Sequence, residues 1–266
     1  MLARFLALNR RCSDFISRRF PSFFGSRSYV DDLKGRINKT IHDLRPGQII
    51  EAGGIDRPLL CKSDQYVYVG IDIAVCDGCY EIYDQFLVQS IESPLDIQGG
   101  LIISTTLLEH VPDNDAAVRS IARALEPGGV THHYVPSKWH PYSIALRIVG
   151  PAMQKKLIPL LRPGAEVVTG YPAYFDHCSA PAMRKLFAKN GLINVEATAY
   201  YRANDYFAAF VPAYLIVTCF ENLCRILGIE LCASGFVVSG MKPAAALGTL
   251  AQGTLSVELA AQEIQQ

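Results

Sequence analysis

The chain lacks three features that would each define a class of protein. No apolar run reaches the ~20 residues that a membrane-spanning helix requires. The formal net charge is zero, so there is no basic excess of the kind that binds nucleic acid. There is no internal repeat. What is left is a globular chain of 266 residues, half of them hydrophobic, which suffices for one large α/β domain with insertions or for two small domains.

Cysteine is present but is poorly arranged for holding a metal. Eight cysteines are scattered along the chain, and only Cys76 and Cys79 form a C-x-x-C pair. A structural zinc site needs about four ligands, and no second pair lies at a suitable spacing. We therefore expect no metal, and a reduced cytoplasmic protein with buried free thiols.

The first 29 residues are rich in arginine and poor in acids. Six arginines stand against Asp14 alone, with leucine, isoleucine and phenylalanine interleaved. Three interpretations are open: a basic amphipathic helix on an anionic membrane or over a ligand, a targeting peptide, or a helix packed on the domain with a solvated basic face. No apolar segment followed by a small-residue cleavage site marks a secretory signal.

The stretch from Gln48 to Ile73 has the layout of a nucleotide-binding unit. One buried strand runs into Glu51 and the turn Gly53-Gly54, and a second buried strand ends in Asp72. Asp72 follows Glu51 by 21 residues, close to the ~20 expected between such a turn and the acid that binds a ribose. Glycine lets the backbone approach a ligand. The segment 61–65 is too short for a long crossover helix, so we expect an abbreviated crossover.

The rest of the chain alternates helices and strands. A helix is expected over 30–44, because apolar residues recur there every three to four positions and Arg-Pro-Gly follows. Further strands are expected at 82–91, 101–104, 130–135, 192–200 and 236–241, and further helices at 115–125, 142–160 and 179–187.

Two motifs then make a family resemblance specific. Leu-Leu-Glu-His-Val-Pro-Asp at 107–113 is followed by Ala-Leu-Glu-Pro-Gly-Gly at 124–129. This order is similar to that of class I S-adenosylmethionine-dependent methyltransferases, and closest to the small-molecule branch called type 11. The resemblance covers about 45–136 well and 175–242 more loosely. It implies a Rossmann-like seven-stranded, mostly parallel sheet with helices on both faces and an antiparallel last strand.

The resemblance also implies roles for particular residues, with S-adenosyl-L-methionine as the cofactor. Glu51, Gly53 and Gly54 would line its methionine end, and Asp72 would bind the ribose hydroxyls with Ile73 beside the adenine. Ile91 would flank the adenine edge, and Thr105 and Leu107 would border the cofactor and the substrate.

The sequence departs from the family pattern at two of these places. Ile55 stands where the family commonly has a further glycine, and Ser90 stands where it commonly has an acid. A β-branched residue resists positive φ. Either the turn is built differently, with Asp56-Arg57-Pro58 holding it, or cofactor affinity is weakened.

Three histidines are candidates for a catalytic base: His110, His140 and His177. The last two lie in an insertion at about 137–178 that is rich in aromatic and titratable residues, which suits a substrate pocket beyond the strand ends. A neutral imidazole titrates near working pH, so each could take a proton from a methyl acceptor. We expect direct methyl transfer to a small or lipid-like acceptor, at oxygen, nitrogen or carbon.

A second insertion, at about 204–234, is apolar from Tyr206 to Phe220 except for Thr218. It could lie in a membrane interface, roof an apolar pocket, form a dimer contact or be a buried helix. The expected organisation is therefore an N-terminal helical segment (1–44), a methyltransferase domain (45–242) with these two insertions, and a flexible tail (243–266). We expect a cytoplasmic protein, with peripheral membrane contact through 1–29 or 206–220 and homodimerisation as open possibilities.

Two other classes of function compete with this one. Tyr134 and Lys138 have the Y-x-x-x-K spacing of short-chain dehydrogenases, but Pro136 lies between them just after a strand, where one helix turn cannot form. A catalytically silent methyltransferase fold, acting as a membrane-associated or scaffolding module, is the non-enzymatic alternative.

Overall fold

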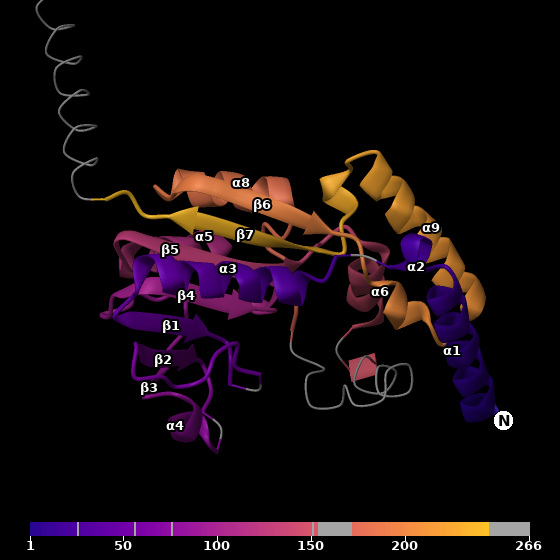
Figure 1. Ribbon diagram of the computed structural model, residues 1–266, viewed down its shortest axis with the longest axis horizontal. Coiled ribbons are helices and arrows are strands. Elements are labelled where there is room, and N and C mark those ends of the chain that lie inside the picture. Colours follow the sequence, from indigo (N-terminus) through magenta and orange to yellow (C-terminus); the bar gives the residue numbers. More distant parts are fainter. Residues whose placement is uncertain (26, 56, 76, 151, 154–171, 245–266) are drawn as a thin grey trace, which may run out of the picture.

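The computed structural model describes residues 1–25, 27–55, 57–75, 77–150, 152–153 and 172–244. Seven strands form one sheet in the order β3-β2-β1-β4-β5-β7-β6 (Figure 1). They are β1 (Gln48–Ala52), β2 (Val67–Asp72), β3 (Gln85–Val88), β4 (Gly99–Thr105), β5 (Leu125–Pro136), β6 (Ile193–Tyr200) and β7 (Gly235–Met241). The first five pair in parallel, and β7 lies antiparallel to both β5 and β6. The expected sheet is confirmed.

Helices cover both faces of the sheet and gather at one end of it (Figure 1). They are α1 (Leu2–Arg19), α2 (Pro21–Phe24), α3 (Tyr29–Leu44), α4 (Cys79–Ile82), α5 (Asn114–Ala124), α6 (Pro141–Val149), α8 (Ala180–Lys189) and α9 (Val211–Ile226), with short 3-10 turns η1 (Leu108–His110), η2 (Asn204–Phe207) and η3 (Glu230–Cys232). α3 packs on one face, and α5 and α8 pack on the other. α1, α2, α6 and α9 lie together beyond the carboxyl ends of the parallel strands.

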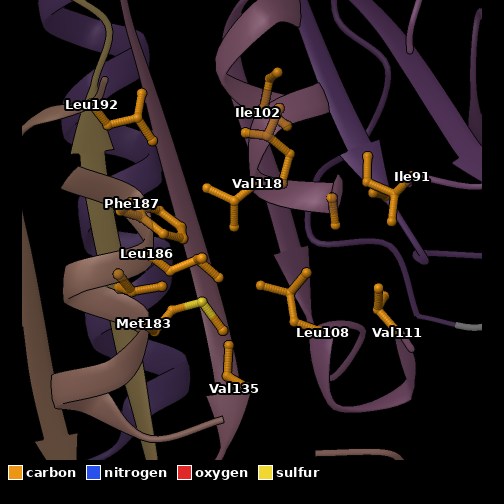
Figure 2. Close-up of a cluster of buried hydrophobic side chains, with 14 of the residues drawn as sticks. Ile91, Ile102, Leu108, Val111, Val118, Val135, Met183, Leu186, Phe187 and Leu192 are labelled. Carbon is orange, nitrogen blue, oxygen red and sulfur yellow. The ribbon is translucent and has the colours of Figure 1, made fainter. Parts of the chain in front are cut away.

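Alternating side chains of the strands fill two hydrophobic clusters, one on each face. On β1, Ile50 and Ala52 face the α5 and α8 side, whereas Ile49 faces α3. Figure 2 shows part of the first cluster, in which Ile102 of β4 lies beside Val118 of α5. Because both faces are covered, the central strands are almost wholly apolar, as parallel strands should be.

The structure corrects the expected strand at 82–91. Only 85–88 form β3, because Ile82 ends α4 and Tyr83 turns its ring into the α3-side cluster. The expected helix at 142–160 is α6, which ends at Val149 before Gly150, and the remainder of that range lies largely outside the described residues.

The Glu-Pro-Gly-Gly run at 126–129 follows the end of a helix, as expected, but it belongs to the next strand rather than to a loop. α5 stops at Ala124, and β5 begins at the next residue. Gly128 donates its N–H to the Lys242 carbonyl (3.0 Å), and Lys242 donates to the Gly129 carbonyl (2.9 Å). This pairing with the chain beyond β7 extends β5 backward, and Gly128 adopts φ +82° to allow it.

The crossover between β1 and β2 is short, as expected, but the abbreviated helix expected in it is absent from its described residues. Within the described part of residues 53–66 there is no helix, and Leu59, Leu60 and Tyr66 cover the sheet instead by packing against the α3-side cluster. The division into an N-terminal segment, a domain and a tail stays a prediction, and 245–266 lie outside the described residues. None of the helices in the described ranges combines the length and the apolar character that a bilayer crossing requires.

Two adjacent histidines of β5 are buried inside the sheet layers. His132 lies between Thr40 Oγ1 (2.9 Å from Nε2) and Ser239 Oγ (2.7 Å from Nδ1). His133 lies 2.7 Å from Ser104 Oγ through its Nδ1 atom. Burial lowers the pKa of His132 to about 4 and that of His133 to about 3. Both rings are therefore neutral, and hydroxyl groups satisfy them.

These histidines predict acid sensitivity of the fold. Their folded pKa values lie below the unfolded value of 6.5, so their stabilising contribution is complete above pH 6.5 and is lost as pH falls toward 4. We expect the contribution of these two histidines to the free energy of unfolding to fall by several kcal/mol between pH 6.5 and 4. A urea titration at each pH measures it. In His133→Gln the slope should be shallower, and an unchanged slope would contradict the assignment.

Candidate functional site

The turn after β1 is shaped by a close contact with the end of β4. Gly53 has φ +74° and donates its N–H to the Ile71 carbonyl (2.8 Å). A Cβ atom at this position would lie 2.9 Å from Leu107 Cδ1. Gly53 is therefore required both by its backbone conformation and by the packing of Leu107.

Glu51 is turned away from solvent, underneath this turn. Its carboxylate accepts hydrogen bonds from the Leu59 N–H (3.0 Å) and from the hydroxyls of Tyr68 and Tyr83. The side chain is fully buried, and burial raises the pKa of Glu51 to about 7 despite these hydrogen bonds. The structure thus gives Glu51 a part in holding the turn, and its contact with the cofactor stays a prediction.

Gly54 is a glycine because of Glu51. A Cβ atom on Gly54 would lie 2.4 Å from Glu51 Cδ and 2.5 Å from the Tyr83 hydroxyl. Ile55 is the departure from the family pattern. Its backbone does not adopt a positive φ, and its side chain packs against the α3-side cluster. The turn is therefore built differently and without strain at Ile55. Asp56, one of the residues expected to hold it, lies outside the described residues.

Asp72 ends β2, one strand away from the turn. It is half-buried, and its Oδ1 atom accepts the Ala74 N–H (3.1 Å). Ile73 beside it is 75% exposed and offers an apolar surface. Ile91 is buried in the core next to this edge, and Ser90 donates its hydroxyl to Glu92 (3.1 Å). The chain therefore places a hydrogen-bond acceptor and an uncovered apolar side chain side by side, as a ribose and an adenine require.

The segment after β4 faces the turn and carries His110. Thr105 ends β4, and Leu107 covers Gly53. His110 Nδ1 lies 2.7 Å from the Pro172 carbonyl, which can only accept, so Nδ1 carries the proton. Burial lowers the pKa of His110 below its usual value. At neutral pH the ring is therefore uncharged, and Nε2 is a proton acceptor.

Glu109 belongs to the same segment, and the sequence patterns gave it no role. Its side chain is buried, with Oε1 3.7 Å from His110 Nε2. Oε2 has no hydrogen-bond partner among the described residues. Burial raises the pKa of Glu109 to about 8. The signal in the sequence was a single acid within the apolar run Leu-Leu-Glu-His-Val, which predicts a buried carboxyl only once the segment is known to be covered.

The three candidate histidines do not come together. His140 is fully buried, where Nδ1 accepts the Tyr142 N–H (3.1 Å) at the start of α6 and Nε2 lies 3.1 Å from Glu221 Oε1. The angle at Nε2 is poor for a hydrogen bond, so the contact with Glu221 is mainly electrostatic. His177 is half-exposed and lies 2.8 Å from Asp176 through Nδ1. Only His110 borders the crevice between β1 and β4, and the catalytic roles of the other two stay predictions.

The described residues contain no cluster of three or more histidine, cysteine, aspartate or glutamate side chains that could hold a metal ion. Cys76 of the C-x-x-C pair lies outside them. Tyr134 stacks on Tyr29 with 3.6 Å between ring centroids, inside a strand rather than on a helix, so the dehydrogenase arrangement with Lys138 does not form.

The sheet order and the site define a class of protein. The strand order reverses between β1 and β4, and doubly wound sheets bind nucleotide cofactors in the crevice at such a switch point. The Gly53 turn, Asp72 and Leu107 lie around that crevice. This is the arrangement of a Rossmann-like enzyme whose cofactor carries a ribose.

Comparison with known families names that class. A family model described as a methyltransferase domain matches residues 7–197. The chain belongs to this family and is a class I S-adenosylmethionine-dependent methyltransferase, with a Rossmann-like fold and S-adenosylmethionine as its cofactor. A comparison with curated proteins finds no match.

Solved structures resemble the chain only distantly. A possible exported protein from Bordetella parapertussis is 14% identical with a TM-score of 0.48, covering 80% of this chain and 68% of its own. Phosphoethanolamine N-methyltransferase 2 from Haemonchus contortus is 12% identical with a TM-score of 0.45, covering 77% and 52%. A methyltransferase from Archaeoglobus fulgidus is 13% identical with a TM-score of 0.48, covering 86% and 98%. The chain thus spans about half of the length of the Haemonchus enzyme.

Asp72→Ala should weaken cofactor binding without unfolding the protein. The change removes a charged acceptor from two hydroxyls, so we expect the dissociation constant for S-adenosylmethionine to rise about 10- to 100-fold. Calorimetric titration measures it, and Asp64→Ala, at an exposed acid of the crossover, is the matched control. Equal affinity in Asp72→Ala and the unaltered protein would remove Asp72 from the site.

Glu51→Gln should change how stability depends on pH. The folded pKa of Glu51 is raised above the unfolded value of 4.5, so its contribution is present below pH 4.5 and is lost as pH rises through about 7. This loss amounts to about 3 kcal/mol. Relative to Glu51→Gln, the unaltered protein should lose this amount of stability between pH 4.5 and 7 in denaturant titrations, and Glu126→Gln, whose glutamate is half-exposed, should lose the same amount. Parallel curves for all three would refute it.

Proposed function

We propose that this methyltransferase transfers a methyl group directly to a small or lipid-like acceptor held beside Glu109 and His110. The observation that carries this proposal is the buried Glu109 carboxyl group, whose Oε2 atom has no hydrogen-bond partner among the described residues, next to a neutral imidazole at the switch-point crevice. A buried carboxyl oxygen without a partner is costly, and a hydrogen-bonding group of a ligand would satisfy it.

The cofactor supplies a methyl group that is already activated on a sulfonium. The protein's task is then to align the acceptor and to keep water out. The acceptor atom bonds to the methyl carbon while the carbon–sulfur bond breaks and its electron pair stays on sulfur. Asp72 and the Gly53 turn would hold the nucleoside and methionine ends, and Leu107 would separate them from the acceptor side.

The acceptor's proton needs a destination, and His110 is placed to receive it. Burial lowers the pKa of His110, so its ring is uncharged at neutral pH, whereas burial raises the pKa of Glu109 to about 8, so its carboxyl group keeps its own proton there. Because the Pro172 carbonyl fixes the His110 tautomer, Nε2 is the atom that accepts. We assign His110 as the base, and Glu109 as the group that orients the acceptor.

The lipid-like part of the proposal rests on the elements near the acceptor side. α6 and α9 lie beyond the carboxyl ends of the strands, tied by the His140–Glu221 contact, and both expose large apolar side chains. An amphiphilic acceptor could keep its chain on this surface while its head group enters the crevice.

The non-enzymatic alternative, a silent methyltransferase fold acting as a membrane-associated or scaffolding module, rests on the Arg-rich residues 1–29, on the apolar stretch 206–220 and on Ile55 in the turn. Since Ile55 adopts no strained backbone, the turn gives no reason to expect lost affinity. Cofactor titration separates the two: a protein that binds neither S-adenosylmethionine nor its demethylated product favours the scaffold.

His110→Gln should lower methyl transfer about 10²- to 10⁴-fold with little change in cofactor affinity, because a general base acts on the acceptor alone. The measurement is formation of S-adenosylhomocysteine with a panel of hydroxyl- and amine-bearing amphiphiles. Glu109→Gln should mainly raise KM for the acceptor. His42→Gln, at an exposed histidine of α3, is the control, and full turnover in His110→Gln would end the base assignment.

A further inference from the structure

α9 carries its polar residues inward and its apolar residues outward. Thr218 and Glu221 are buried, where Glu221 accepts the Ala203 N–H (2.6 Å) and Thr218 accepts a hydrogen bond from Asn204 (3.0 Å). The exposed residues of α9 and of its C-cap are mostly apolar, with Arg225 as the one charged exception; the apolar members form the outer face and are Pro212, Leu215, Ile216, Cys219, Leu223, Ile226 and Leu227. Ile216 is 69% exposed and Ile226 is 77% exposed. A helix of a water-soluble protein shows the opposite pattern unless another apolar phase covers it.

α1 adds a second exposed apolar stripe, and this one is bordered by arginines. Three exposed apolar residues lie on one side of α1, because they are spaced by three and then by seven residues, or about one and two helical turns. They are Phe5, Leu8 and Phe15. Three exposed arginines recur every seven residues beside that stripe: Arg4, Arg11 and Arg18. Asp14 is the one acid of the helix. An apolar stripe flanked by arginines is typical of helices that lie in a lipid interface.

The two helices belong to one lobe at one end of the molecule (Figure 1). Ser13 of α1 donates its hydroxyl to the Ala208 carbonyl (3.0 Å), and Asn9 accepts the Val211 N–H (3.0 Å) at the start of α9. α2 continues the contact, since Phe24 stacks on Tyr214 with 5.3 Å between ring centroids. Polar and aromatic contacts thus fix α1 against α9 through their other faces and leave the apolar outer faces exposed.

We propose that the outer faces of α1 and α9 bind the surface of an anionic phospholipid bilayer and lie in its interface. Charge decides between this occupant and a second copy of the chain. In a two-fold dimer through this lobe the arginines of one α1 would approach those of the other, whereas lipid phosphates complement them. This inference concerns attachment and does not depend on which acceptor is methylated.

Co-sedimentation of the full chain with vesicles tests the proposal. We expect the protein to pellet with vesicles of phosphatidylcholine and phosphatidylglycerol, and much less with phosphatidylcholine alone. The double variant Ile216→Glu and Ile226→Glu should remain in the supernatant. The triple variant Arg4→Gln, Arg11→Gln and Arg18→Gln should lower partition into anionic vesicles by about a hundredfold, since each arginine near the surface contributes about a fivefold step.

Leu44→Glu is the matched control, because Leu44 is an exposed apolar residue at the opposite end of the sheet and its replacement should leave sedimentation unchanged. Circular dichroism and cofactor titration verify that each variant is folded. Absence of the full chain from every vesicle pellet, or equal pelleting of the Ile216→Glu and Ile226→Glu variant, would overturn the proposal. So would a dimer, seen by light scattering, that the same variant dissociates in the absence of vesicle binding.

Discussion

A buried carboxylate holds together the half of the sheet that faces the cofactor. Glu51 receives hydrogen bonds from the backbone of the short crossover and from Tyr68 and Tyr83, so one side chain joins β1, the crossover, β2 and the entry to β3. A crossover helix normally covers this part of a doubly wound sheet. Here the hydrogen-bonded acid and the aromatic rings around it replace that helix, and the Gly53 turn is fixed from below. The local rigidity that cofactor binding requires therefore comes from this cluster.

The opposite side of the crevice depends on burial rather than on hydrogen bonding. Glu109 and His110 sit in a covered segment: the Glu109 carbonyl accepts the Tyr174 and Phe175 N–H groups, and the His110 ring donates to the Pro172 carbonyl. Removing water from these groups shifts their pKa values in opposite senses, upward for the acid and downward for the imidazole. At neutral pH the Glu109 carboxyl group therefore keeps its proton, while the His110 ring is uncharged and can accept one.

The seven-stranded, mostly parallel sheet with its antiparallel last strand could be predicted from the family resemblance, and the shortness of the crossover from the few residues between the first two strands. Strand limits were harder: β5 extends back through Pro127 and Gly128 because it pairs with the chain after β7, a contact between residues more than a hundred positions apart. The burial of Glu109 could not be predicted either, because it depends on contacts with residues far along the chain. One of them is the Tyr174 N–H, 65 residues later, which donates to the Glu109 carbonyl (2.9 Å). Sequence patterns also could not tell which histidine meets the crevice, since all three are lone residues in apolar surroundings.

The packing of Gly54 against Glu51 also restricts how this sequence can drift over generations. No side chain fits at position 54 while the carboxylate occupies the space above it, and shortening Glu51 would leave Tyr68 and Tyr83 without their acceptor. Each of the two positions therefore restricts which residues the other can accept. Substitutions at these positions are compatible with the fold only if both change together and the two tyrosines change with them. Homologues should accordingly fall into two discrete groups at these four positions, with few intermediates.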